Sequence, residues 1–321
     1  MIKKLLTGLA AAALVTLAPA HAQDLKEINF GIISTESSQN LKSDWQPLLE
    51  DMAKKTGYKV NAFFAPDYAG IIEGMRFGKV HVAWFGNKSA MEAVDRAGGE
   101  IFAQMVNADG TQGYYSHLIV HKDSPLKSLD DVLKNARNLS FGNGDPNSTS
   151  GFLVPSYYVF AQNKIDAKTA FKVSRGANHE SNALAVANKQ VDVATNNSEN
   201  LDKIKDRLPE KFKDIRIVWT SPLIPLDPLV MRKDLPDASK QKLKDFFYGY
   251  GKGGQQEKDV LMKISKLSAF KPSSNAQLIP IRQLELFKER NKFEADATFP
   301  AADKQARVAE IDRKLAELSR N

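Results

Sequence analysis

Hydrophobic and polar positions follow two alternating patterns along residues 24–121. Short apolar runs rich in β-branched residues end in polar clusters, as buried parallel strands do. Between these runs, apolar residues recur at helical spacing. This strand–helix–strand order predicts a parallel sheet covered by helices. The predicted strands are 28–33, 58–64, 80–84, 100–106 and 114–121, and the predicted helices are 41–56, 66–77 and 87–97.

A weaker copy of the same pattern follows later in the chain. Residues 79–83 lead into a helix near Asn87, and residues 190–194 lead through a turn at 195–197 into a helix near Ser198. The copy predicts an α/β fold of two similar lobes. Ligands of such sheets bind beyond the carboxyl ends of the strands, here in a cleft between lobes joined by a hinge. The expected parts are lobe 1 at 23–115 and 228–295, lobe 2 at 116–227, and a C-terminal helical tail at 296–321.

The tail is charged and carries Val308, Ile311, Leu315 and Leu318 at helical spacing. Such a stripe indicates only that one face of the helix is buried. The helix therefore either packs on the protein's own surface or docks on a partner, which makes a homodimer through the tail one possible arrangement.

The first residues have the pattern of an export signal. A basic start is followed by an apolar run and by Ala20-His21-Ala22, which predicts a secretory signal peptide at 1–22. The chain has no cysteine, so we expect neither disulfides nor a lipid anchor on the exported protein. These features predict a free periplasmic protein.

Charge and motifs exclude several classes of function. The formal charge of +7 becomes +5 without the signal peptide, and the basic residues are interspersed with acids, which argues against a nucleic-acid partner. Walker, Gly-x-Ser-x-Gly and His-Glu-x-x-His motifs are absent from the sequence, and the histidines lack metal-ligand spacing. We therefore expect a binding protein that uses no cofactor or metal.

Residues 142–151 are the most informative stretch. A Gly-, Asp- and Pro-containing turn places Ser148, Thr149 and Ser150 at the start of a helical run, where free backbone N–H groups and hydroxyls can hold an anion. The same residue types are also ordinary helix caps. From the residues alone, both interpretations stay open.

Five other residues lie where pocket walls are expected. His179 opens a helix at 180–188, Glu199 follows the turn at 195–197, and Asp227 lies between two prolines at the return crossing. Tyr68 and Tyr114 lie at strand-end or loop positions. Each has an alternative as a cap, surface or core residue, which spacing alone does not exclude.

Five motifs are distinctive, at 63–70, 142–151, 182–194, 196–202 and 221–225. They resemble the periplasmic phosphonate-binding component of bacterial phosphonate ABC importers, and the resemblance extends to about residue 288. It implies a type II periplasmic binding fold that captures alkylphosphonates, notably 2-aminoethylphosphonate, and delivers them to an inner-membrane permease. It further implies that Ser148, Thr149, Ser150 and His179 hold the phosphonate, that Tyr68 and Tyr114 supply a wall and hydroxyl donors, and that Glu199 and Asp227 hold the ammonium.

One position departs from the family pattern. Phe85 stands where the family is expected to carry a tyrosine, and this difference affects the expected fine selectivity among ligands.

A binding protein for phosphite, methylphosphonate or phosphate is the main alternative, against which Glu199 and Asp227 argue. A periplasmic phosphoryl-transfer enzyme would need a metal cluster or an activated nucleophile. A chemosensory protein of the same fold would differ in its partner.

Overall fold

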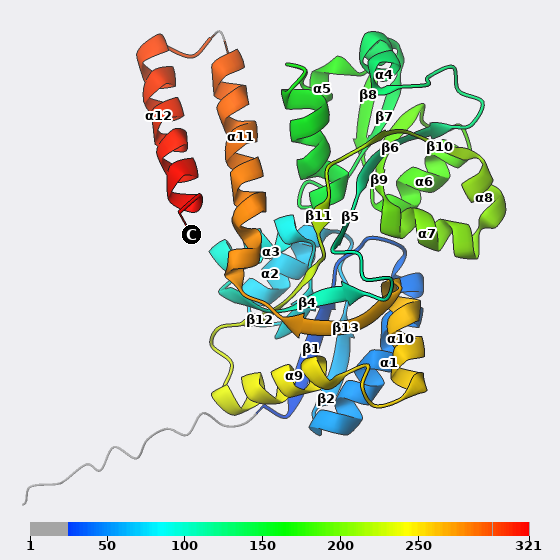
Figure 1. Ribbon diagram of the computed structural model, residues 1–321, viewed down its shortest axis with the longest axis vertical. Coiled ribbons are helices and arrows are strands. Elements are labelled where there is room, and N and C mark those ends of the chain that lie inside the picture. The colour runs from blue at the N-terminus through cyan, green and yellow to red at the C-terminus, as the bar shows by residue number, and fades with distance from the viewer. Residues whose placement is uncertain (1–24, 297, 321) are drawn as a thin grey trace, which may run out of the picture.

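The structure is a computed structural model that describes residues 25–296 and 298–320, and their strands form two main sheets (Figure 1). The first sheet has the order β13-β4-β12-β3-β1-β2. Strands β1 to β4 share one direction, whereas β12 and β13 run antiparallel to their neighbours. The strands are β1 (Glu27–Ile32), β2 (Lys59–Phe63), β3 (Val82–Trp84), β4 (Gly99–Asn107), β12 (Pro228–Arg232) and β13 (Leu267–Pro272).

The second sheet has the order β10-β6-β9-β7-β8. Strands β7, β8, β9 and β10 share one direction, and β6 runs against them. The predicted α/β class with parallel-rich sheets is therefore confirmed, but both sheets also contain antiparallel strands. The strands are β6 (Ser116–His121), β7 (Ser140–Asn143), β8 (Val173–Gly176), β9 (Val193–Asn197) and β10 (Ile215–Thr220).

The chain crosses between the two sheets at a small antiparallel ladder of β5 (Gly113–Tyr114) and β11 (Ile224–Pro225). The single strand expected at 114–121 is wrong in this respect. It is divided at Tyr115, where the chain leaves this ladder and enters the second sheet as β6. We keep the lobe boundaries given above as a proposal, since the ladder lies close to both of them.

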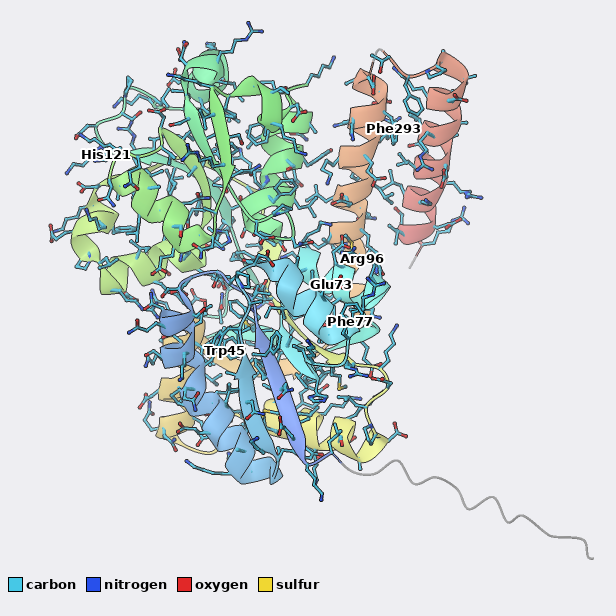
Figure 2. The ribbon with its side chains drawn as sticks, turned by 180° about the vertical axis from the view of Figure 1, so that it is seen from behind. Trp45, Glu73, Phe77, Arg96, His121 and Phe293 are labelled. Carbon is cyan, nitrogen blue, oxygen red and sulfur yellow. The ribbon has the colours of Figure 1, made fainter. Side chains whose placement is uncertain are left out.

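Helices cover the faces of both sheets (Figure 1). Helix α1 has the buried apolar stripe that its spacing predicts, and Trp45 in that stripe lies inside the lower lobe of Figure 2. With the first sheet lie α1 (Ser38–Thr56), α2 (Tyr68–Arg76), α3 (Asn87–Arg96), α9 (Asp237–Gly249) and α10 (Gln255–Ser265). With the second lie α4 (Leu129–Asn135), η1 (Ala136–Asn138), η2 (Thr149–Leu153), η3 (Ser156–Ala161), α5 (Ala167–Ala170), α6 (His179–Ala187), α7 (Ser198–Arg207) and α8 (Pro209–Lys213).

The C-terminal region begins with η4 (Asn275–Leu278) and forms a hairpin of α11 (Ile279–Ala295) and α12 (Ala301–Leu318), which lie side by side (Figure 1). Phe293 points toward α12, where the guanidinium of Arg307 is 5.7 Å from its ring centroid (Figure 2). Ile311 of the predicted stripe is only 2% exposed, so this part of the stripe packs against the protein's own surface. Helix α11 also reaches the second sheet's side, since Phe287 and Tyr157 of η3 have ring centroids 6.0 Å apart.

Two expectations concern membranes and export. Among residues 25–296 and 298–320, none of the helices combines the length and apolarity that crossing a bilayer requires. The predicted signal peptide at 1–22 lies outside the described residues.

Candidate ligand-binding site

The stretch at 142–151 folds back on itself so that its hydroxyls begin a helix. Gly144 N donates to Gly151 O at 3.0 Å, and a Cβ on Gly144 would lie 2.4 Å from that carbonyl group, so only glycine fits there. Ser148 Oγ accepts from Gly151 N at 3.0 Å, which confirms the helix-cap interpretation for this residue. A hydroxyl that accepts in this way still has its own hydrogen to donate, so a cap can also bind an anion.

The side chains around these hydroxyls are buried and uncharged. His179 Nε2 lies 3.4 Å from Ser148 Oγ and 3.5 Å from Ser150 Oγ, and Asn197 Nδ2 donates to Ser150 Oγ at 3.0 Å. Burial lowers the pKa of His179 to about 4, so the ring is neutral at pH 7. Ser148, Thr149, Ser150 and His179, here called the anion side, therefore offer hydrogen bonds without a fixed positive charge.

Two carboxylates lie in the same pocket, and we call them the carboxylate side. Asp227 Oδ2 accepts from Trp84 Nε1 at 3.0 Å, and Oδ1 accepts from the Tyr114 hydroxyl at 3.3 Å. Burial and the nearby charge of Glu199 raise the pKa of Asp227 well above its usual range. Burial likewise raises the pKa of Glu199 to about 7. Two buried acids that repel each other in this way are stabilised most by a cation placed between them.

The two tyrosines connect the anion side with the carboxylate side. The Tyr114 hydroxyl donates to Asp227 Oδ1 at 3.3 Å, and both tyrosines line the pocket together with Ser148 and Ser150. Their exposed fractions are 2% and 4%, and burial raises the pKa of both phenols. Both phenols therefore stay protonated at neutral pH and can donate to a ligand.

Contacts between the two sheets' elements close this pocket. Lys88 N in α3 donates to Thr149 Oγ1 at 2.8 Å, and Tyr68 N donates to Asp145 Oδ2 at 3.1 Å. Glu180 at the start of α6 accepts from Ser37 N at 2.7 Å, before α1. Only about 30 Å³ between the lining side chains stays accessible to water-sized molecules. The structure thus has a nearly closed cleft.

A four-charge cluster supports this closure next to the pocket. Glu36 and Asp44, which lie beside the first sheet, are 4% and 1% exposed. Lys203 Nζ of α7 lies 2.5 Å from Glu36 Oε1 and 3.2 Å from Asp44 Oδ2, and Arg207 pairs with both acids. The attraction in a buried ion pair offsets the free energy of desolvation only when the charged groups are in close contact. These four groups are in contact in the closed cleft, so the cluster favours the closed arrangement over an open one.

The structure brings together all eight residues named from the sequence: Tyr68, Tyr114, Ser148, Thr149, Ser150, His179, Glu199 and Asp227 line one pocket. Sequence reasoning missed other lining residues. Thr35 and Trp84 lie at or just after the carboxyl ends of β1 and β3, where the rule for α/β sheets could have found them. Residues such as Ser265, at the end of α10, have no comparable signal. The other lining residues include Thr35, Glu36, Trp84, Asn197, Asn200 and Lys203.

Two expectations about single segments change. The turn expected at 195–197 is wrong, because these residues are the buried end of β9, whose ladder with β6 continues to Asn197. Asn197 then caps α7. Phe85 is fully buried in the core and is not a lining residue of the pocket, so its expected effect on selectivity has no direct contact to act through.

His81, His117 and His121 lie outside the pocket. His117 and His121 are both buried on β6, and His121 lies in the upper lobe of Figure 2. Within the described residues, no group of three or more His, Cys, Asp or Glu side chains is placed to hold a metal ion.

Comparison with known proteins identifies the family. The family described as "ABC transporter, phosphonate, periplasmic substrate-binding protein" matches residues 30–278. The chain belongs to this family. Members are substrate-binding components of importers, which confirms the expectation of a binding protein in place of an enzyme. Membership also confirms the periplasmic location and implies a permease as partner.

Individual relatives agree with this family. The chain is 60% identical over 305 residues to the phosphonates-binding periplasmic protein of Escherichia coli strain K12, a match that covers 95% of this chain and 89% of the relative. A binding protein component of an ABC phosphonate transporter from Pseudomonas aeruginosa has a similar structure, with a TM-score of 0.90 at 58% identity over 92% and 98% of the two chains. The Phosphate-import protein PhnD of Mycolicibacterium smegmatis is 30% identical and matches 68% of this chain and 70% of its own.

Proposed function

We propose that this protein captures aminoalkylphosphonates, with 2-aminoethylphosphonate as the preferred ligand, for an inner-membrane ABC permease. One observation carries the proposal: a cluster of neutral hydrogen-bond donors and a pair of mutually repelling carboxylates line the same small pocket. A ligand with an anion at one end and an ammonium at the other satisfies both sides at once.

On the anion side, Ser148, Thr149, Ser150 and His179 hold the phosphonate oxygens. A phosphonate presents up to three acceptor oxygens, and hydroxyls, the first backbone N–H groups of a helix and a neutral imidazole are all donors. A charge-assisted hydrogen bond is about twice as strong as one between neutral groups, so a fixed cation is not needed.

On the carboxylate side, Glu199 and Asp227 hold the ammonium, while Tyr68 and Tyr114 form a wall and donate hydrogen bonds. A bound ammonium offsets the repulsion between the two acids, which would otherwise remain when a ligand lacks that group. This penalty is the basis of selection against methylphosphonate, phosphite and phosphate. Phosphate is a real competitor for the anion side, since a relative at 30% identity is named for phosphate import.

A thermal-shift panel tests this function. A ligand that binds only the native state stabilises it by RT ln(1 + [L]/Kd), so the melting temperature ranks ligands by affinity. We expect 2-aminoethylphosphonate to raise the melting temperature most, methylphosphonate less, and phosphite and phosphate least. A larger rise with phosphate than with either phosphonate would refute the proposal.

We also propose that residues 1–22 are removed on export and that the mature protein is free in the periplasm. The absence of cysteine from the sequence supports a protein without a lipid anchor. A homodimer through α12 remains the alternative use of the tail, although its apolar stripe already packs within the chain.

A further inference from the structure

One wall of the pocket carries buried polar atoms that lack partners among the described residues. Asn200 is 4% exposed, yet neither Oδ1 nor Nδ2 of its side chain has a hydrogen-bond partner there. The same holds for Thr35 Oγ1 and for Nδ1 of His179. All three residues line the pocket. Burying polar groups without partners is unfavourable, so three such residues in one pocket indicate that a ligand supplies the missing partner.

Asn200 and Thr35 both lie close to His179. Asn200 N donates to Asn197 Oδ1 at 2.7 Å, and Asn197 Nδ2 lies 3.3 Å from His179 Nε2. Asn197 caps α7 and Asn200 lies in its first turn, so the two residues are neighbours at the start of this helix. From the other side of the cleft, Thr35 O accepts from Glu180 N at 3.3 Å, so Thr35 lies beside His179 as well.

Each of the three residues has an unpaired atom that can donate, which indicates the chemistry of their partner. Asn197 Nδ2 can only donate, so a neutral His179 that accepts at Nε2 carries its proton on Nδ1. The Asn200 amide nitrogen and the Thr35 hydroxyl are donors too. Three donors in one wall of the pocket fit an anionic oxygen, and Asn200 Oδ1 is the one unpaired atom among them that can only accept.

We propose that Asn200 is a further ligand-binding residue, which holds an oxygen of the ligand's anionic group together with Thr35 and His179. This inference rests on the proposed function, because it takes a phosphonate as the anion. It extends the anion side across the cleft, since Thr35 follows β1 of the first sheet whereas Asn200 and His179 belong to helices of the second. The phosphonate would then connect both sides of the closed cleft.

The test combines Asn200→Leu, Thr35→Val and a matched control. Leucine has nearly the size of asparagine but cannot form hydrogen bonds. Thr195→Val is the control, because Thr195 Oγ1 is also buried without a partner among the described residues, yet Thr195 is not a lining residue. Calorimetric titration gives Kd for 2-aminoethylphosphonate and methylphosphonate, and the unliganded melting temperature reports on stability.

We expect Asn200→Leu to weaken both ligands by a similar factor, about tenfold to hundredfold, because a hydrogen bond to a charged group is lost. Thr35→Val should weaken both in the same direction, and Thr195→Val should leave Kd unchanged. The unliganded melting temperature of Asn200→Leu should stay the same or rise, since an unpaired amide is removed. If Asn200 had only a structural role, the substitution would lower the unliganded melting temperature and leave Kd unaltered.

Three results would overturn the inference: an unchanged Kd in Asn200→Leu, a loss confined to the amino-bearing ligand, or an equal loss in Thr195→Val. If Asn200→Leu does not fold, Asn200→Asp keeps the shape and polarity and sets a carboxylate against the anion. It should weaken both phosphonates by more than a hundredfold, and an unchanged affinity would overturn the inference equally. Failure of the unaltered protein to bind any phosphonate would instead refute the proposed function.

Discussion

Asp227→Asn separates recognition of the ammonium from recognition of the phosphonate. The substitution keeps the shape of the side chain, and its amide oxygen can still accept from Trp84 or Tyr114. It removes the negative charge, which is 5% exposed and faces a second acid, Glu199. Only a ligand that carries an ammonium should lose a partner.

The size of the effect follows from the burial of this charge. Removing one partner of a buried, hydrogen-bonded charge pair costs about 2 to 5 kcal/mol. Two features place Asp227→Asn near the lower end of this range. Glu199 still pairs with the ammonium, and the raised pKa of Asp227 means that part of the binding free energy is used to remove its proton. We therefore expect a loss of about hundredfold in Kd for 2-aminoethylphosphonate.

Methylphosphonate should behave in the opposite way. It has no ammonium, so removing a negative charge from the pocket should leave its affinity unchanged or increase it. The unliganded protein should not lose stability, because the amide relieves the repulsion between two buried acids.

Isothermal titration calorimetry with both ligands at pH 7.5 measures these effects. Asp51→Asn is a matched control, since Asp51 is a carboxylate of similar burial, 7% exposed, that accepts from the Tyr250 hydroxyl and is not a lining residue. The control should leave both Kd values unchanged. Equal losses for the two ligands in Asp227→Asn would refute the assignment of Asp227 to the ammonium.

Three further predictions concern other parts of the protein. Thr149→Ala removes a hydroxyl of the anion side and its bond to Lys88 N, so calorimetry should show all phosphonates weakened alike, by about tenfold; a loss confined to amino-bearing ligands would contradict this. Because burial raises the pKa of Glu199 to about 7, this group takes up a proton as the pH falls from 8 to 5. Affinity for 2-aminoethylphosphonate should therefore fall more than affinity for methylphosphonate, and Glu199→Gln should reduce this difference. Parallel pH profiles for the two ligands in the unaltered protein would count against this role of Glu199. Deleting 301–321 should leave affinity intact, because α12 contributes no lining residue to the pocket. If the tail is a dimer arm, light scattering should show that the truncated protein is a monomer and the full-length protein a dimer. The same oligomeric state for both would exclude a dimer through the tail.

The sequence pattern predicts the inner elements of the fold better than its edges. The apolar stripe of α1 and the runs of β1 and β3 were predictable, because these elements are buried in the first sheet's core. Strands β8, β10 and β13 lie at the edges of their sheets and are partly exposed, so their side chains lack a clear period. The polar end of β9 has the pattern of a turn, because a buried strand of Thr195, Asn196 and Asn197 has the composition of a loop.

The candidate site divides in a similar way. Residues 148–150 and Glu199 carry local signals, since they follow strands and begin helices. Thr35, Asn200 and Lys203 gain their importance only when the cleft closes and sets one sheet's loops against the other's helices. Neither the closure nor an unpaired atom can be derived from one stretch of sequence.

The most direct test of a site with an anion side and a carboxylate side is calorimetric titration of the unaltered protein with 2-aminoethylphosphonate, methylphosphonate and phosphate. The paired acids predict that 2-aminoethylphosphonate binds at least about a hundredfold more tightly than methylphosphonate, and that phosphate binds more weakly still. Equal or tighter binding of methylphosphonate or phosphate would contradict a site built for an ammonium-bearing phosphonate.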